Sequence, residues 1–100
     1  MKLRDHPLMS YGGIANWPPV WTSTSVAEPL RGEIGILKRV MLHPFLPRRC
    51  FLMIEHEKQR YMGCLLFDDV AFSKEIHELL QLYVGCSIEE IGNIDLSHTL

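Results

Sequence analysis

The sequence predicts a small α+β domain in which one C-terminal amphipathic helix covers an antiparallel sheet of three to four strands. Three observations indicate this class: apolar runs of strand length in mid-chain, a helical spacing after them, and six prolines confined to the first 47 residues. A chain of this length hides most of its unfolded surface on folding, which suffices for one core. We expect one domain over 1–100, made of an N-terminal arm (1–32), strands (33–67), and a helix with a C-terminal cap (68–100).

The arm carries turn signals and apolar residues together. Gly12-Gly13, Pro18-Pro19 and the Thr-Ser repeat at 22–25 favour turns and extended chain. The same stretch is too rich in large apolar side chains for a free tail. We expect an irregular but ordered aromatic arm with a short strand at Val20 to Ser23, and a mobile arm is the alternative.

Three strands follow from the apolar patterns. Residues 33–42 alternate in hydrophobicity, whereas 50–54 and 61–67 are nearly continuous apolar runs. Two prolines predict a loop over 43–47. The polar stretch 55–60 predicts the tip of a β-hairpin centred near Lys58, which places Cys64 opposite Met53 or Leu52.

The clearest helix is expected over 70–84. Its apolar stripe has helical spacing, with Asp68 or Asp69 as N-cap and Gly85 at the left-handed end position. The stripe consists of Phe72, Ile76, Leu79, Leu80 and Tyr83. Ser87 to Glu90 has the form of a capping box, which predicts a one-turn helix before an extended Ile94 to Leu96.

Both faces of the predicted strands are apolar, so each face requires a cover. The helix covers one face, and the aromatic arm of residues 8–21 is the natural cover for the other. A half-open SH3-like barrel with a helix is the alternative fold, because residues 32–40 also fit the bent first strand of such a barrel.

Composition excludes several classes. No apolar run approaches the ~20 residues that span a membrane, and the first residues lack the apolar core of a signal peptide, so we expect a cytoplasmic protein. The net charge of −2 argues against a strongly basic nucleic-acid binder. The charge is unevenly spread: residues 31–60 carry seven cations and three acids, whereas residues 61–100 carry one cation and seven acids.

The chain has no recognisable catalytic or metal-binding set. Three cysteines without close pairing predict neither a zinc site nor a disulfide framework, and Cys64 fits a small buried apolar residue. Asp68 and Asp69 are explained by helix capping. We therefore expect no metal and no cofactor, and an enzyme would have to use His56 or His43 near these two aspartates.

The function predicted from the residues is a small non-enzymatic binding or adaptor domain with an aromatic and proline-rich surface. Two indoles around a stiff Pro-Pro can form an apolar clamp, although the sequence favours burial of both rings on the sheet over this clamp. A protein partner or self-association is expected. The candidate binding residues are Tyr11, Trp17, Pro18, Pro19, Trp21, Arg48, Arg49 and His56.

Two other function classes stay open beside a binding domain. Basic residues concentrated in 31–60 could bind single-stranded nucleic acid if aromatic rings lay exposed beside them. A small enzyme with histidine and aspartate as acid and base is the other alternative.

Four segments of the chain are distinctive together: RDHPLMSY (4–11), NWPPVW (16–21), RGEIGIL (31–37) and YMGCLLFDD (61–69). In these segments the chain resembles a family of short bacterial proteins to which no activity, cofactor or partner is assigned. The resemblance implies a bacterial domain of this length that stands alone, and it implies no functional residue.

Overall fold

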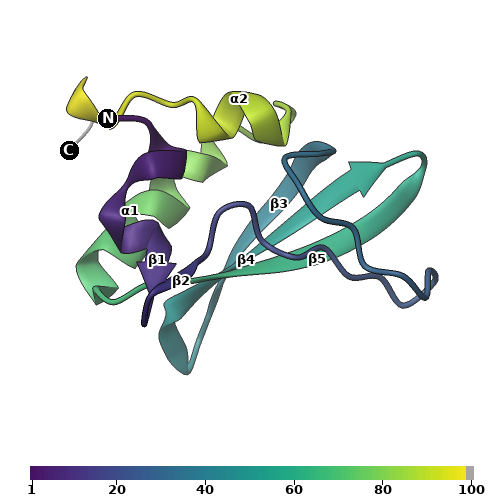
Figure 1. Cartoon of the computed structure of the whole chain (residues 1–100), viewed down its shortest axis with the longest axis horizontal. Helices are drawn as coiled ribbons and strands as arrows, with labels where there is room; N and C mark the ends of the chain where they lie inside the picture. Colours follow the sequence, from purple (N-terminus) through teal and green to yellow (C-terminus); the bar gives the residue numbers. More distant parts are fainter. Residues whose placement is uncertain (99–100) are drawn as a thin grey trace.

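The computed structural model describes residues 1–98 and has an α+β architecture (Figure 1). Its centre is an antiparallel sheet in the order β3 (Ile36–His43), β4 (Leu46–His56), β5 (Gln59–Leu66), followed by α1 (Val70–Gln81) and the short α2 (Ile88–Gly92). The prediction of an antiparallel sheet with a C-terminal helix is confirmed at this level. The remaining elements are the 3-10 turns η1 (Leu3–Asp5), η2 (Pro7–Met9) and η3 (Leu96–His98) and the two-residue strands β1 (Ser10–Tyr11) and β2 (Ile14–Ala15).

The turns of both hairpins are shorter than the sequence predicts from the proline-containing stretch 43–47 and the polar stretch 55–60. Only Glu57 and Lys58 form the β4–β5 turn, and both have the positive φ angles of a two-residue hairpin. The predicted loop over 43–47 is wrong, because His43 pairs with Leu46 and β4 already includes Pro47. The last pair of β4 with β5 is Arg49 with Leu66, so Pro47 lies beyond the end of β5 and its missing N–H costs no bond there.

Helix α1 begins as expected and ends earlier than expected. The Asp69 carboxylate accepts a hydrogen bond from the Phe72 amide at 2.9 Å, which caps the first turn. The helix stops at Gln81 rather than at residue 84. The reason is a tertiary contact with the edge of β3. The Gly85 amide donates to the Leu37 carbonyl at 2.8 Å, and the Leu37 amide donates to the Cys86 carbonyl. The chain therefore leaves the helix to pair with β3.

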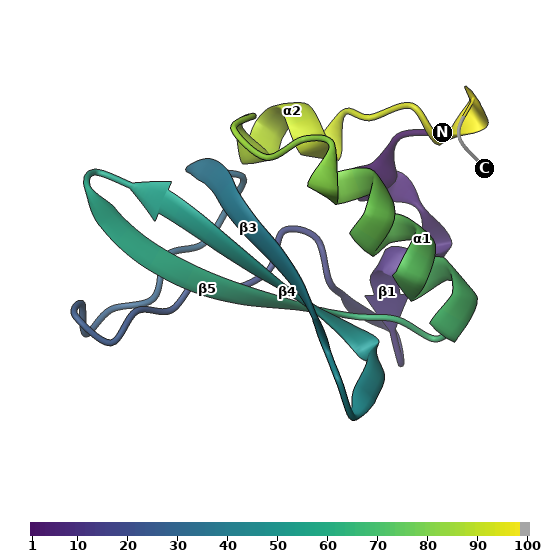
Figure 2. The same cartoon turned by 180° about the vertical axis from the view of Figure 1, so that it is seen from behind.

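The C-terminal segment closes against the N-terminus. The Ser87 hydroxyl accepts from the Glu90 amide at 3.1 Å, which confirms the capping residue of α2. Lys2 then forms an antiparallel bridge with Asp95. Figure 2 shows the N-terminal turns lying beside α1, where the His6 ring stacks on Phe72 with ring centres 4.4 Å apart.

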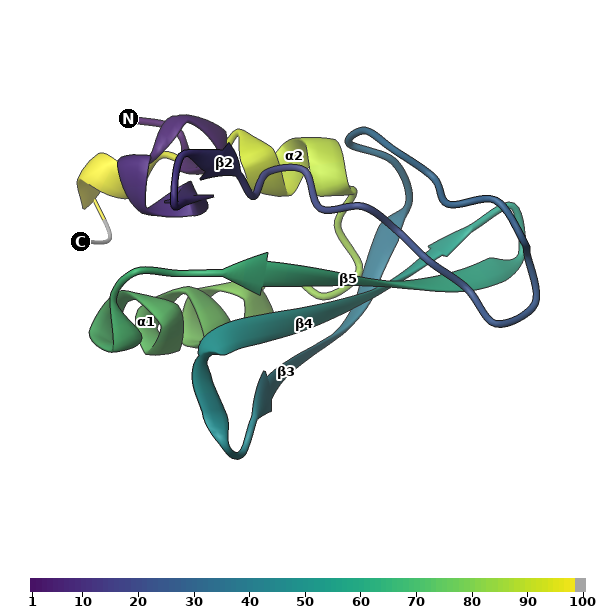
Figure 3. The ribbon, with the colours of Figure 1, turned by 60° about the horizontal axis from the view of Figure 1, so that its bottom comes forward.

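The arm is ordered and continues the sheet beyond β5. Thr22 exchanges two backbone hydrogen bonds with Met62, and Trp21 exchanges two with Leu30. These bridges stand where the short strand at Val20 to Ser23 is expected. Figure 3 shows the arm passing beside β5 and turning back near the β4–β5 hairpin.

The arm covers the same sheet face as the helix, which corrects the expectation of one cover on each face. A Cβ atom on Gly63 would lie 2.6 Å from the Trp21 ring. Gly63 pairs with the fully buried Leu52 on the face whose Cys50 and Ile54 are also fully buried. The arm therefore packs on this inner face together with α1.

The opposite sheet face stays without a cover from residues 1–98. Its apolar side chains are half-buried and do not belong to the main core. We call this surface the open face and define it by Met41, Phe51, Met53, Met62 and Cys64, which the strand pairing places side by side.

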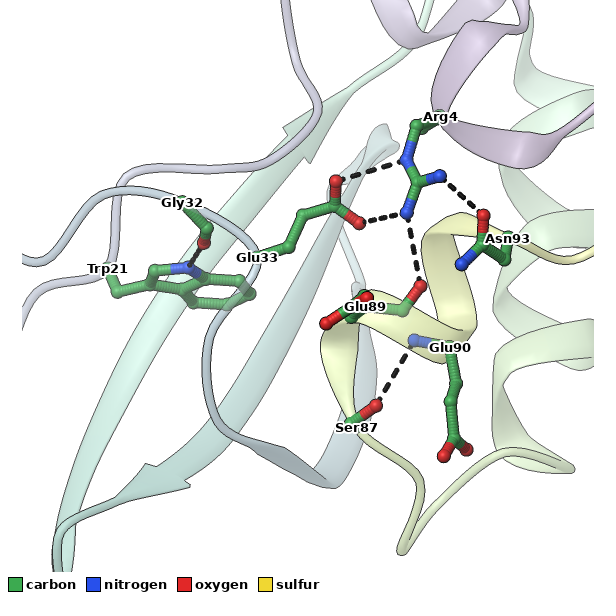
Figure 4. A network of polar contacts seen from close by, with 8 residues as sticks. All are labelled: Arg4, Trp21, Gly32, Glu33, Ser87, Glu89, Glu90 and Asn93. Carbon is green, nitrogen blue, oxygen red and sulfur yellow. Dashed lines mark hydrogen bonds and ion pairs between the residues drawn. The ribbon is translucent and has the colours of Figure 1, made fainter.

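A network of polar contacts joins three segments that are distant in sequence. The Arg4 guanidinium donates to both carboxylate oxygens of Glu33, at 3.0 and 2.5 Å, and also to the Asn93 side chain and the Glu89 carbonyl (Figure 4). The hydrogen bond to Glu33 raises the pKa of Arg4, whose guanidinium group is in any case always charged in proteins. Arg4 thereby ties the first turn to the loop before β3 and to α2.

Substituting Gly63→Ala tests the contact with Trp21. The added methyl group cannot fit beneath the indole, so we expect the free energy of unfolding in urea to fall by about 1–3 kcal/mol. Cys64→Ala is the matched control, because its side chain points to the open face and its effect should stay within about 1 kcal/mol. An unchanged stability of Gly63→Ala would contradict this packing.

Substituting Arg4→Met tests the network in Figure 4. We expect a lower midpoint of urea unfolding, because Glu33 and Asn93 lose their shared donor. Arg31→Met, which removes an exposed arginine of the same arm, should leave the midpoint unchanged. The effects of Arg4→Met and Glu33→Gln should not add in the double variant, and additive effects would show that the two groups act independently.

Candidate functional site

A pocket of about 220 Å³ lies where β4 begins, β5 ends and the arm crosses them. It combines two basic side chains with an aromatic and aliphatic wall. We call it the arginine pocket. It is lined by Tyr11, Leu46, Pro47, Arg48, Arg49, Leu66 and Phe67.

Backbone contacts hold the walls of this pocket in place. The Asn16 side-chain amide, which is buried, donates to the Leu66 carbonyl and fixes the β1–β2 hairpin to the end of β5. The Phe67 amide donates to the Arg48 carbonyl at 2.9 Å. Tyr11 stands on that hairpin, next to the Gly12-Gly13 turn, where both residues have the positive φ angles that suit glycine. Three separate stretches of chain therefore converge on the pocket.

The pocket has positive charge without a carboxylate to balance it. The Arg48 guanidinium carbon lies 5.7 Å from the centre of the Tyr11 ring. This distance is within the range of a cation–π contact. Neither Arg48 nor Arg49 forms an ion pair within residues 1–98, and both side chains are exposed. Both guanidinium groups can therefore receive an anion.

Of the eight predicted binding residues, three meet in the arginine pocket: Tyr11, Arg48 and Arg49. The two indoles do not form an exposed clamp, which corrects that hypothesis. Trp21 is 0% exposed and donates its ring N–H to the Gly32 carbonyl at 2.9 Å, and Trp17 is 8% exposed. They serve as packing residues.

The two prolines between the indoles are also wholly or partly buried. Pro19 is buried, and a methyl group on Gly63 would lie 2.9 Å from its ring. Pro18 is half-buried. The Pro-Pro step therefore carries the arm across the inner face and is not part of the candidate site.

His56 lies at the opposite end of the sheet from the arginine pocket. It pairs with Gln59 beside the β4–β5 turn, whereas Arg49 pairs with Leu66 at the other end. A strand advances by a fixed rise at each residue, so about two thirds of the length of β4 separates His56 from Arg49. Asp68 and Asp69 follow Leu66, so the structure does not bring His56 to these aspartates.

His43, the other histidine of the enzyme hypothesis, stabilises the β3–β4 turn. The Nδ1 atom of His43 accepts from the Phe45 amide at 3.1 Å, and its ring contacts Phe45 and Phe51. Asp69 in turn caps α1. Within residues 1–98, no group of three histidine, cysteine or acidic side chains is arranged to hold a metal ion.

The cysteines are free thiols in different environments. Cys64 lies opposite Phe51, and not opposite Met53 or Leu52 as the expected hairpin centre implies, because the turn is centred between residues 57 and 58. Burial raises the pKa of Cys50 to about 12. Burial also raises the pKa of Cys64, and the nearby Arg49 opposes that shift.

Four residues of the pocket were not predicted as site residues: Leu46, Pro47, Leu66 and Phe67. Each is apolar and lies at or next to a strand end, where core packing is the ordinary explanation. The Pro-Arg-Arg sequence at 47–49 is a partial signal, since it places two adjacent cations next to an apolar stretch.

Comparisons of the chain with protein-family models, with curated proteins and with solved structures find no match. The resemblance to short bacterial proteins therefore stays a prediction. None of the helices in the part of the chain that the structure describes is long and apolar enough to cross a membrane.

Alkylation with N-ethylmaleimide tests the thiol environments. At pH 8, a pKa of about 12 leaves roughly one Cys50 thiol in ten thousand ionised, so Cys50 should remain unmodified while Cys64 reacts slowly. Peptide mass spectrometry measures both rates, and in urea all three cysteines should react alike. Native labelling of Cys50 as fast as Cys64 would contradict the burial of Cys50.

Proposed function

We propose that the protein is a non-enzymatic binding domain that receives, in the arginine pocket, a carboxylate carried on an apolar body. The observation that carries this proposal is the pair Arg48 and Arg49, which has no carboxylate partner within residues 1–98 and borders an apolar hollow. The last residue of a partner protein's chain has this chemistry.

The two parts of the pocket suit the two parts of such a ligand. A guanidinium group can donate two parallel hydrogen bonds to a carboxylate, which gives both strength and orientation. Leu46, Pro47 and Phe67 offer apolar contact on the other side. The pocket volume of about 220 Å³ is smaller than the pockets that hold drug-sized molecules, so it fits a single residue rather than a large cofactor.

Tyr11 restricts where the anion can bind. Its ring already faces the Arg48 guanidinium, which limits the rotamers of that side chain and reduces the entropy lost on binding. A ligand carboxylate can then approach the edge of the guanidinium group, where its N–H donors point. Arg49 supplies the second positive charge.

Titration of the ¹⁵N-labelled protein with N-acetyl-leucine tests the proposal. We expect chemical-shift changes at Tyr11, Arg48 and Phe67, with a dissociation constant on the order of 1 mM because a single small residue is bound. Arg48→Gln and Arg49→Gln should each weaken binding about five- to tenfold. Arg39→Gln, which removes an exposed arginine outside the pocket, is the matched control and should bind as the wild type does.

Three further ligands separate the possible sources of the signal. N-acetyl-leucinamide lacks the charge and should not bind, and equal binding of this amide would contradict the proposal. Inorganic phosphate lacks the apolar body, and tighter binding of phosphate would replace a carboxylate with a phosphate ligand. A pentapeptide ending in leucine should bind at least as tightly as N-acetyl-leucine, and its exclusion would indicate a small organic acid in place of a protein terminus.

A further inference from the structure

We infer that the open face is a second binding surface, which docks a partner protein through an apolar patch bordered by carboxylates. This inference goes beyond the arginine pocket and does not require it. It rests on three observations: an uncovered apolar face, a highly exposed phenylalanine at one end, and a surplus of arginines around it.

The open face is apolar although the helices do not cover it and the arm only borders it, where Thr22 to Thr24 line a hollow together with Met53 and Met62. Phe51 lies between Met41 on β3 and Cys64 on β5, and Met53 pairs with Met62. These side chains are half-buried by one another and stand outside the main core. Contiguous exposed apolar patches on soluble proteins commonly mark interaction sites.

Phe45 extends the open face beyond the strands. It is 85% exposed at the β3–β4 turn, and its ring lies 6.3 Å from that of His43, which in turn lies 6.1 Å from Phe51. The His43 imidazole holds this turn by accepting from the Phe45 amide. Aromatic side chains, phenylalanine among them, are enriched at protein interfaces, and this one is held in solvent by a defined turn.

The border of the open face is positive. The sequences of β3, β4 and β5 contain five lysines and arginines and a single acid, Glu55. Glu55 is already 3.7 Å from the Lys38 ammonium group. Arg39 pairs across from Met53 and Arg60 pairs across from Glu55, whereas Arg49, two residues before Phe51 on β4, also lines the arginine pocket. Charge complementarity therefore selects a partner with carboxylates around its apolar patch.

A second copy of this chain in symmetric contact fits the open face less well than an acidic partner does. Two open faces in symmetric contact would bring arginines toward arginines, which costs affinity. The exposed acids of the helices lie on α1 and α2, which belong to the inner side of the sheet. They include Glu75, Glu78, Glu89 and Glu90.

Single-stranded nucleic acid also fits the open face less well than an acidic protein does. Three of the five residues that define the open face are methionines, whose flexible side chains adapt to apolar protein surfaces. The chain as a whole has a net charge of −2, whereas nucleic-acid-binding domains are commonly basic. An acidic protein surface is thus the occupant that the apolar and charged residues favour together.

Selection of random dodecapeptides displayed on phage against the wild-type protein tests the inference. We expect enriched peptides in which aspartate or glutamate flanks aromatic or aliphatic residues. A synthetic copy of an enriched peptide should bind Phe45→Ser and Met53→Glu at least tenfold more weakly than the wild type. Because Phe45 is 85% exposed, Phe45→Ser should fold normally, which circular dichroism can verify.

Two control variants make the test specific. Leu82→Ser removes an apolar side chain that is 80% exposed at the end of α1, and it should bind the peptide within twofold of the wild type. Arg48→Gln should also bind the peptide within twofold, so that loss of the arginine pocket and loss of the open face are told apart.

Several results would overturn the inference. One is a selection that enriches no peptide, or enriched peptides without net negative charge. Another is equal binding of the peptide to Phe45→Ser, Met53→Glu and the wild type. A dimer in sedimentation equilibrium that Phe45→Ser dissociates would assign the open face to a second copy. Tighter, Phe45-dependent binding of a short oligothymidylate would assign it to nucleic acid.

Discussion

The packing of Trp21 against Gly63 fixes the side of the sheet on which the arm lies. The indole occupies the space that any side chain at position 63 would need, and its ring N–H is satisfied by the Gly32 carbonyl. The arm therefore shares the inner face with α1 and completes the core there. Because one face receives both covers, the opposite face of the same three strands is left with half-buried methionines, Phe51 and Cys64.

The same course of the arm creates the arginine pocket. The β1–β2 hairpin is held at the end of β5 by Asn16, and this brings Tyr11 over Arg48. Arg4 also holds the N-terminus in place, because it joins the first turn to Glu33 and to α2 (Figure 4). The basic segment thus lies on the sheet, and the acidic segment contributes most of its charge to the helical side, so positive charge gathers at the pocket and around the open face.

Local signals in the sequence were sufficient to predict where several helices and strands begin or end. Asp69 and Ser87 cap the helices because each side chain satisfies a backbone amide within its own first turn. The polar stretch around Lys58 marks the β4–β5 hairpin, because a polar segment between two apolar runs is also a signal confined to neighbouring residues. The end of α1 was not predictable in this way, because pairing of Gly85 and Cys86 with Leu37 decides it. Pro47 likewise argued against a strand, and the conflict is removed because β5 ends before it and the register shift between Leu42 and His43 leaves it unpaired on the β3 side.

The sequence by itself determined the α+β class and the order of strands and helix along the chain. Periodicity and capping depend on neighbours a few residues away, so one sequence suffices to read them. Only the tertiary structure decided that both covers share one face, that the indoles are buried, and that Tyr11 meets Arg48 and Arg49. These outcomes depend on contacts between residues far apart in the chain, such as Trp21 with Gly63, and such contacts leave no periodic pattern in a single sequence.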